Sequence, residues 1–132
     1  MNEVITHADV CLNGDVLGDL AITGSVDLKD GVQIIVEKIH PDAVIPDIAH
    51  SLDSGFDLYS VEDVFLFPWE IGRVVKTGLR FDIGYGFHVE VLPRSGWSVK
   101  SGLRIANSPG LVDNPYTGEV GVIVDNLSYD EL

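Results

Sequence analysis

Short blocks of hydrophobic residues, separated by polar and turn-forming residues, recur along most of the 132-residue chain. No stretch has a convincing helical periodicity, whereas several blocks are rich in the β-branched and aromatic residues that favour strands. Strands are expected at 32–39, 56–60, 64–67, 87–92, 105–107 and 119–125, with one or two more around Gly78.

Frequent turns separate these blocks. The chain contains 14 Gly and 6 Pro, and turns are expected at 84–86 and 108–110. The strand spacing and turn density favour an all-β fold, either a jelly-roll sandwich or a distorted β-barrel. We assign this domain to residues 32–132. Residues 1–31, with four Gly, five Asp and no Pro or aromatic residue, form an N-terminal extension of unknown role.

The formal net charge of -13 limits the partners that the chain attracts. The charge repels nucleic acid and anionic membranes at long range, so neither is an expected partner. A polyanionic ligand would need well-placed cations from the 8 Lys and Arg residues. A divalent cation would help such a ligand approach, because it cancels part of the ligand's charge.

The sequence carries no recognisable signal for secretion or membrane insertion. The first residues lack a basic region followed by an apolar core, and no apolar run is long enough to span a bilayer. Cys11 is the only cysteine, which excludes an intrachain disulfide and a thiolate metal cluster. The four His residues show no ligand spacing, and no Walker loop or dinucleotide fingerprint occurs. A cytoplasmic location is expected.

Residues that can bind a phosphate chain follow the expected strand 87–92. Arg94 offers a planar fork of donors for phosphate oxygens, Ser95 adds a hydroxyl, and Gly96 lets backbone N–H groups approach a ligand closely. An ordinary surface turn is the simpler explanation when this short motif is taken alone.

The segment 107–119 contains further candidates. Asn107 and Gly110 occupy turn positions that are expected in any hairpin. Asp113 is either a simple turn residue or a partly shielded carboxylate that orients a water for attack. Tyr116 is either a core aromatic, the commoner fate of Tyr in a β protein, or a side chain that stacks on a sugar or base.

Asp57 lies between two apolar residues of an expected strand, and a buried Asp there needs a partner. Either an edge or solvent-facing position explains Asp57, or its carboxylate braces an Arg or a hydrated metal ion. His88 is expected to face solvent or form a hydrogen bond and not to act in catalysis.

Three segments, in this order, resemble the motifs of the trimeric dUTP pyrophosphatase (dUTPase) family. Ser-Gly-Phe-Asp-Leu-Tyr at 54–59 resembles the first motif and Pro-Arg-Ser-Gly at 93–96 the second. Gly-Leu-Val-Asp-Asn-Pro-Tyr-Thr-Gly-Glu at 110–119 resembles the third. Residues 38–46 and Lys-Thr-Gly-Leu at 76–79 are similar to linking segments of the family. Together these matches are highly specific, and they extend from about residue 32 to residue 128.

The resemblance implies a jelly-roll or distorted-barrel subunit of the dUTPase type, in a homotrimer with sites between subunits. It also implies a hydrolase of nucleotide metabolism, a dUTP diphosphatase. Such an enzyme uses Mg2+ to hydrolyse dUTP to dUMP and pyrophosphate through water attack on the α-phosphate. The magnesium would be held mainly by substrate phosphates and water, with no direct protein ligand.

The family's pattern, carried over residue by residue, implies how the chain would handle the phosphates. Asp113 would position and activate the attacking water and contact the deoxyribose 3′-OH. Arg94, Ser95 and Gly96 would hold phosphates, and Asp57 would support the phosphate and metal side.

The same resemblance implies how the nucleoside would be recognised. Asn107, together with backbone groups of the hairpin that contains Gly110 and Val112, would read uracil. Tyr116 would pack under the deoxyribose and leave no room for a 2′-OH.

The chain also departs from the family's pattern. Trp97 stands where the family usually has a smaller aliphatic residue, and Thr117 where it often has Arg. A fourth motif, like Gly-Asp-Arg-Ile-Ala-Gln-Leu, and a Gly-rich closing arm do not follow the third motif before Leu132. Low activity is therefore expected, because water exclusion and phosphate positioning would suffer. Residues 14–20 faintly echo the fourth motif, and we hypothesise that they fill its strand position, although an unrelated extension is the simpler explanation.

Two other functions stay open beside dUTP hydrolysis. A catalytically weak or inactive dUTPase-like trimeric module for binding or regulation agrees with the missing motifs, but the retained candidate residues argue against it. A deaminase of the related dCTP deaminase family ranks last. The hairpin at 107–110 and Tyr116 look more like a uracil pocket than like the cytosine pocket of that deaminase family.

Overall fold

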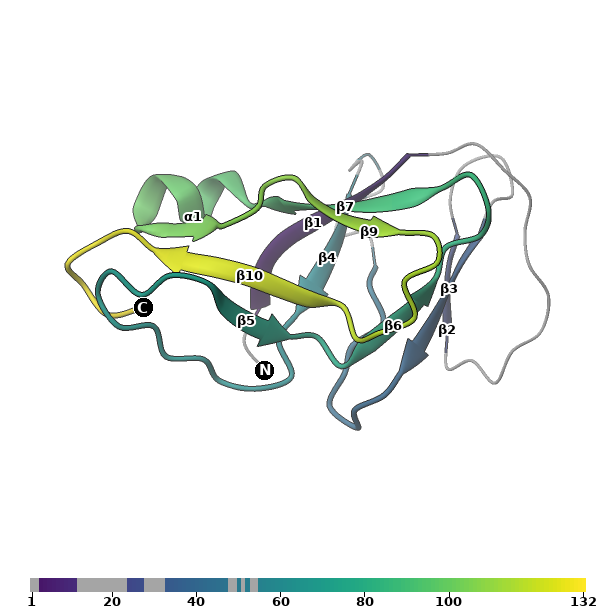
Figure 1. The fold of residues 1–132 in the computed structure, drawn as a ribbon, viewed down its shortest axis with the longest axis horizontal. Coiled ribbons are helices and arrows are strands. Elements are labelled where there is room, and N and C mark those ends of the chain that lie inside the picture. Colours follow the sequence, from purple (N-terminus) through teal and green to yellow (C-terminus); the bar gives the residue numbers. More distant parts are fainter. Residues whose placement is uncertain (1–2, 12–23, 28–32, 48–49, 51, 53–54) are drawn as a thin grey trace.

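The computed structural model describes residues 3–11, 24–27, 33–47, 50, 52 and 55–132, and these residues form strands and one short helix (Figure 1). The elements are β1 (Glu3–Cys11), β2 (Gly24–Asp27), β3 (Gln33–Lys38), β4 (Phe56–Tyr59), β5 (Arg73–Lys76), β6 (Leu79–Asp82), β7 (His88–Pro93), α1 (Ser95–Lys100), β8 (Leu103–Ile105), β9 (Gly110–Asp113) and β10 (Gly121–Asn126). The expected all-β class is confirmed. The described residues contain no helix with the length and apolarity that a membrane crossing requires.

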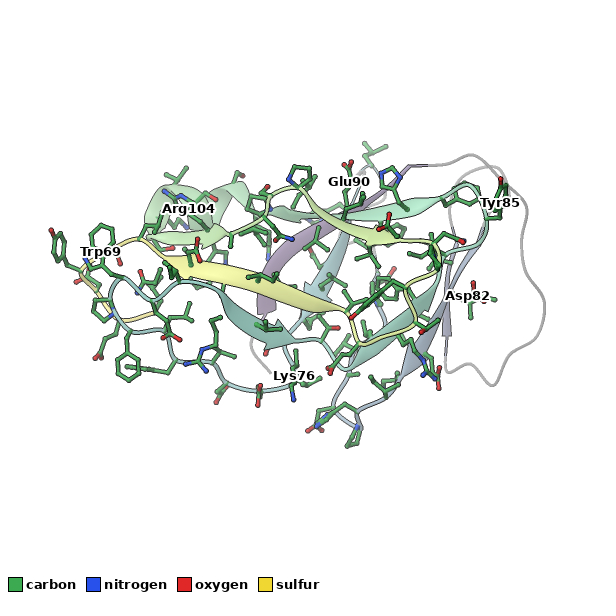
Figure 2. All side chains as sticks on the ribbon, viewed as in Figure 1. Trp69, Lys76, Asp82, Tyr85, Glu90 and Arg104 are labelled. Carbon is green, nitrogen blue, oxygen red and sulfur yellow. The ribbon has the colours of Figure 1, made fainter. Side chains whose placement is uncertain are left out.

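The strands form three antiparallel sheets. Their orders are β4-β1-β7-β9, β5-β10-β8 and β2-β3-β6. In Figure 1 the β5-β10-β8 sheet runs lengthwise beside β7 and β9, with α1 at one end of the molecule and the β2-β3-β6 sheet at the other. Figure 2 shows the same separation, since Trp69 lies near the α1 end and Tyr85 at the opposite end.

Alternating burial along the strands builds one hydrophobic core between the sheets. In β10 every second residue is buried, and Val122 and Val124 are almost inaccessible to solvent. Val89 and Val91 of β7 and Leu79 of β6 join them in the same core cluster. This two-residue period leaves the intervening side chains of β7 on the other face of its sheet.

The expected strand at 64–67 is wrong. Only Leu66 of this segment is buried, and its backbone N–H and C=O pair with Leu132 at 2.7 and 3.1 Å. Phe65 and Phe67 stay exposed and pack edge to face, with ring centroids 5.4 Å apart. The apolar content of the segment therefore indicated a strand, but its backbone has too few partners to form one.

The elements α1, β8 and β9 also differ from the sequence-based expectation, which gave no strand at Gly110–Asp113. Helix α1 was not expected, because it is only six residues long and has no buried residue, so it has no apolar periodicity. The strand expected at 105–107 is β8, which ends at Ile105 and leaves Asn107 in the following turn. The other expected strands correspond to β3, β4, β5, β6, β7 and β10.

The N-terminal segment contributes two strands to the sheets. β1 lies between β4 and β7, and β2 pairs with β3. The boundary expected at residues 31 and 32 stays a prediction, because both residues lie outside the described ranges. Residues 14–20, which were hypothesised to fill the position of the fourth motif, also lie outside the described residues.

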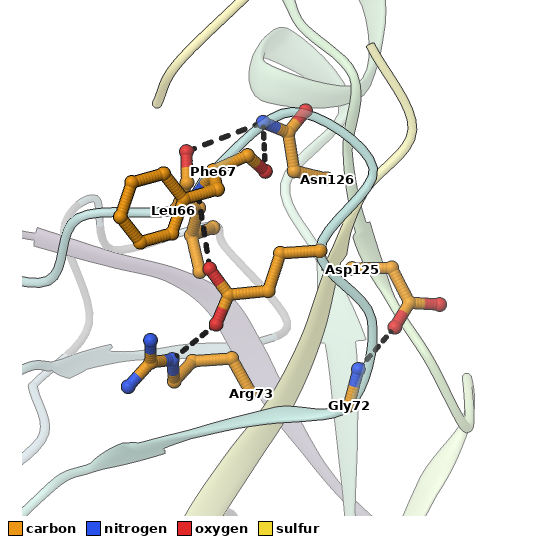
Figure 3. Close-up of polar contacts among 7 residues, drawn as sticks. Leu66, Phe67, Gly72, Arg73, Asp125 and Asn126 are labelled. Carbon is orange, nitrogen blue, oxygen red and sulfur yellow. Dashed lines mark hydrogen bonds and ion pairs between the residues drawn. The ribbon is translucent and has the colours of Figure 1, made fainter.

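Asn126 joins the end of β10 to the loop before β5 (Figure 3). Its side chain is fully buried, and its Nδ2 donates to the carbonyl oxygens of Phe67 at 3.0 Å and Asp130 at 2.7 Å. Its Oδ1 accepts from the N–H and the hydroxyl of Ser128 at 3.1 and 2.7 Å. A single buried amide therefore has its own polar atoms satisfied by groups of two loops and ties these loops together.

The loop joined by Asn126 contains a tight turn that its polar groups stabilise. The Glu70 N–H donates to the Phe67 carbonyl at 3.1 Å, and Trp69 has a φ of 59°, a value that usually selects Gly at this turn position. The Glu70 carboxylate accepts from the Phe67 N–H at 2.9 Å and from Arg73 Nε at 2.7 Å. The Arg73 guanidinium first, and then the Phe67 N–H, hold the pKa of Glu70 below its usual range.

We expect Asn126→Ala to lower the free energy of unfolding by about 3 kcal/mol, because the substitution removes the hydrogen bonds of a fully buried amide and leaves a cavity in its place. Chemical denaturation followed by circular dichroism measures this loss. The neighbouring Leu127 is 45% exposed, so Leu127→Ala is the control and should cost less than about 1 kcal/mol. Similar losses in the two variants would contradict a special role for Asn126.

Candidate functional site

Arg94 and Ser95 lie where β7 ends and α1 begins. Arg94 is in the extended conformation (φ -79°, ψ 126°), and its carbonyl accepts from the N–H groups of Trp97 and Ser98 at 3.1 and 3.2 Å. The chain therefore turns directly from strand to helix at Arg94. A Cβ on Gly96 would meet nothing within 4 Å, so the glycine leaves open space on the outside of this turn.

A cleft of about 630 Å³ lies beside this turn. Its lining residues are Arg94, Ser95, Gly96, Trp97, Lys100, Ser101 and Leu132. Arg94 and Lys100 supply cationic side chains, and none of these lining side chains is a carboxylate. In a chain of net charge -13, this cleft is a place where an anion would be attracted. Lys100 was not expected as a site residue, because it lies outside the four-residue motif.

The second group of candidate residues surrounds the turn between β8 and β9. A Cβ on the buried Gly110 would lie 3.4 Å from both terminal atoms of the Asn107 side chain and 3.4 Å from Val91 Cβ. The amide of Asn107 therefore rests against the start of β9. Val112 is partly buried and packs against the core, which fixes the strand from its inner side.

β9 is the outer strand of its sheet. Within the described residues it pairs with β7 alone, so one of its backbone edges faces away from the sheet. Such an edge presents N–H and C=O groups in a regular row. A planar base with its own donors and acceptors can be recognised by this kind of row.

Tyr116 lies over Gly118, and of its two interpretations from the sequence, the core aromatic is wrong. The ring is 46% exposed, and its hydroxyl donates to the Glu119 carbonyl at 2.8 Å. A Cβ on Gly118 would lie 2.6 Å from the hydroxyl oxygen of Tyr116. The Tyr116 N–H donates to the Asp113 carbonyl at 3.0 Å, so a short turn fixes the two residues relative to each other.

The far end of this loop is fastened to the segment between β5 and β6. Thr77 is fully buried, and its hydroxyl donates to the Val120 carbonyl at 2.5 Å. The Gly78 N–H donates to Glu119 Oε1 at 2.9 Å, and the Val120 N–H donates to the Leu79 carbonyl at 2.8 Å. The Lys-Thr-Gly-Leu segment at 76–79 therefore supports the loop that carries Tyr116. The sequence alone did not indicate this role.

Asp113 lies at the opposite end of β7 from Arg94. The strand register pairs Asp113 with His88, the first residue of β7, whereas Arg94 follows the last residue. At about 3.3 Å per residue, the six-residue separation of His88 and Arg94 corresponds to about 20 Å. The Asp113 side chain is exposed, so the chain alone does not shield it as one interpretation of the sequence required. A single chain therefore does not bring Arg94 and Asp113 together.

Asp57 lies on the outer strand β4 but is only 4% exposed, so a solvent-facing position is wrong. Its N–H donates to the Asp47 carbonyl at 3.3 Å. The register places His7 opposite both Asp57 and Leu92, which is two residues before Arg94. Asp57 therefore belongs to the Arg94 end of the sheet rather than to the Asp113 end.

Among the described residues, no group of three or more His, Cys, Asp or Glu side chains could hold a metal ion. These residues therefore do not form the oxygen-rich protein cage that binds Ca2+ or Mg2+ directly.

The fold and these two groups of residues define a β protein with an anion-attracting turn and a hairpin whose backbone is open. The sequence profile of the dUTPase family matches residues 41–132, and the chain belongs to this family. The deoxyuridine 5′-triphosphate nucleotidohydrolase of Solibacter usitatus is 45% identical over 101 residues, covering 75% of this chain and 68% of the relative. That of Helicobacter pylori is 42% identical over 97 residues, covering 74% and 66%.

Solved dUTPase structures agree with this assignment. The dUTPase from phage phi11 of S. aureus has a TM-score of 0.67 at 33% identity, covering 72% of this chain and 60% of that chain. The Staphylococcus bacteriophage 80alpha dUTPase has the same TM-score and identity, with 74% and 61% covered. Another phi11 structure describes coordination of a structural Mg(II) ion. The expected family and jelly-roll type of fold are confirmed, and the chain spans about 60% of these two solved chains.

We expect Gly118→Ala to displace the Tyr116 ring, because the new Cβ would lie 2.6 Å from its hydroxyl oxygen. The ring is half-exposed and can swing outward, so the loss in unfolding free energy should be about 1 kcal/mol, the value of one hydrogen bond. Ring resonances of Tyr116 measured by NMR report the movement. Gly96→Ala, which meets nothing within 4 Å, is the control. An unmoved Tyr116 ring in Gly118→Ala would refute the contact.

Proposed function

We propose that this chain is a dUTP diphosphatase that acts as a homotrimer with Mg2+. The observation that carries the proposal is the third-motif hairpin. It presents an open backbone edge, the Asp113 carboxylate and the Tyr116 ring in adjoining positions. The family assignment and the names of the relatives support dUTP as the substrate.

In this proposal Asp113 acts as the general base. Its carboxylate accepts a proton from a water whose oxygen forms a new bond to the α-phosphorus of dUTP. The bond between the α-phosphorus and the bridging oxygen then breaks, and pyrophosphate leaves. Most of the rate enhancement comes from placing the water and neutralising phosphate oxygens rather than from covalent chemistry.

The remaining candidates bind and orient the nucleotide. Arg94, with Ser95 and the backbone of Gly96, holds phosphate oxygens at the cleft beside α1. Asn107 and the backbone edge of β9 read the uracil. Tyr116 packs under the deoxyribose, where a 2′-OH would collide with the ring.

The separation of Arg94 and Asp113 along β7 supports a site built between subunits. One residue follows the last residue of β7 and the other lies opposite its first. About 20 Å is too far for both to reach the phosphate chain of one bound nucleotide from one chain. A neighbouring copy that supplies its own Arg94 turn next to this chain's hairpin would complete the site.

Mg2+ arrives bound to the substrate in this proposal, because the described residues form no cage for the ion. Carried on the triphosphate, the ion would neutralise charge that the phosphates bring to a chain of net charge -13.

A non-catalytic nucleotide-binding module is the second candidate. The exposure of Asp113 and Tyr116 favours it, since a general base works best where water is excluded. The two candidates differ in turnover but not in nucleotide binding.

We expect Mg2+-dependent release of pyrophosphate from dUTP, with much less release from dTTP, dCTP and UTP. Asp113→Asn should lower kcat by about 100-fold or more, the usual contribution of a general base, while dUTP affinity stays similar. Pyrophosphate release and calorimetric titration measure the two quantities. Asp42→Asn, an exposed substitution in another loop, is the control.

Unchanged turnover in Asp113→Asn would refute its role as the base. Binding of dUTP without turnover by the wild-type protein would favour the non-catalytic module. Ammonia release from dCTP would indicate a deaminase instead.

Mixing two inactive variants tests the shared site. Arg94→Ala and Asp113→Asn should each be inactive, but trimers refolded from an equal mixture should regain about a quarter of wild-type activity. In such trimers, about a quarter of the sites receive an intact Arg94 from one subunit and an intact Asp113 from another. Absence of regained activity, with mixed trimers shown by mass spectrometry, would place both residues of each site in one chain.

A further inference from the structure

His88 lies directly opposite Asp113 in the pairing of β7 with β9. Directly opposed residues of antiparallel strands share one face of the sheet, with Cβ atoms about 5 Å apart. Val89 and Val91 point into the core, so His88 and Asp113 lie on the other face. The side chain of His88 is 36% exposed, so its ring lies at the surface on the face of the sheet that also carries Asp113.

The His88 ring contacts the carboxylate of Glu90. His88 Nε2 lies 3.4 Å from Glu90 Oε1, and Figure 2 shows Glu90 on the outer side of β7. With Nε2 directed at Glu90, Nδ1 is the ring nitrogen left to interact with Asp113. β1 also packs against β7, and its register places Cys11 opposite His88 and Asp9 opposite Glu90.

We propose that His88 is a positioning residue for dUTP hydrolysis, which orients the Asp113 carboxylate. This inference rests on the proposed function. A base whose second oxygen is held by a neighbouring N–H presents its first oxygen to the water in one direction.

Two substitutions test this positioning. His88→Leu removes the donor, and it should lower kcat for dUTP about tenfold, with KM changed by less than about twofold. A tenfold change corresponds to about 1.4 kcal/mol, within the range of one hydrogen bond to a charged group. His88→Gln keeps a side-chain N–H donor, so it should keep most of kcat.

His40→Gln is the matched control. His40 is exposed, and its Nδ1 accepts from the Asp42 N–H in a loop distant in sequence from the hairpin. Its kcat and KM should equal those of the wild type. Thermal unfolding of all variants checks that the fold is retained.

The outcomes distinguish this inference from the proposed function. Wild-type turnover that depends on Asp113, together with an unchanged kcat in His88→Leu or an equal loss of kcat in His88→Gln, would overturn the role of His88 alone. A wild-type protein without dUTP turnover would overturn the proposed function and this role with it. A rise in KM at constant kcat would also contradict positioning of the base, because it would indicate a contact with bound substrate.

Discussion

The register between β7 and β9 is the constraint on which the candidate site depends. Val89 and Val91 are buried in the core, and Val112 packs against the same core from β9. A slip of one residue would turn Val112 toward solvent and Asp113 toward the core, which is strongly unfavourable. Burial of a few aliphatic side chains therefore decides that the carboxylate faces outward, opposite His88 and at the far end of β7 from Arg94.

Rigid parts of the fold hold the exposed loop in place. Thr77 and Gly78 fasten Glu119 and Val120, so the loop that carries Tyr116 has a fixed end as well as a fixed start. Asn126 does the same at the other end of β10. Polar groups buried between segments distant in sequence thus give an otherwise exposed hairpin a defined shape.

The sequence predicted the elements whose own residues determine them. The β-branched runs of β3 and β10 and the turns beside Gly84 and Pro109 are local properties, and so are the family motifs. Leu66 shows the limit, because a strand also needs a partner strand, whereas the Leu66 backbone bonds Leu132 and the Asn126 side chain. The burial of Asp57 and the distance between Arg94 and Asp113 depend on strand order and register, which motif spacing does not contain. The role of Thr77 was missed for the same reason.

The outer position of β9 has a consequence for the behaviour of the protein in solution. An exposed strand edge can pair with the edge of another molecule, and proteins commonly protect such edges with Pro, Lys or a bulge. If β9 recognises a base through its backbone as proposed, Pro, Lys or a bulge there would remove the groups that the base needs. Mutual repulsion between chains of net charge -13 opposes pairing of two such edges, so the acidic composition has a role in keeping the edge available.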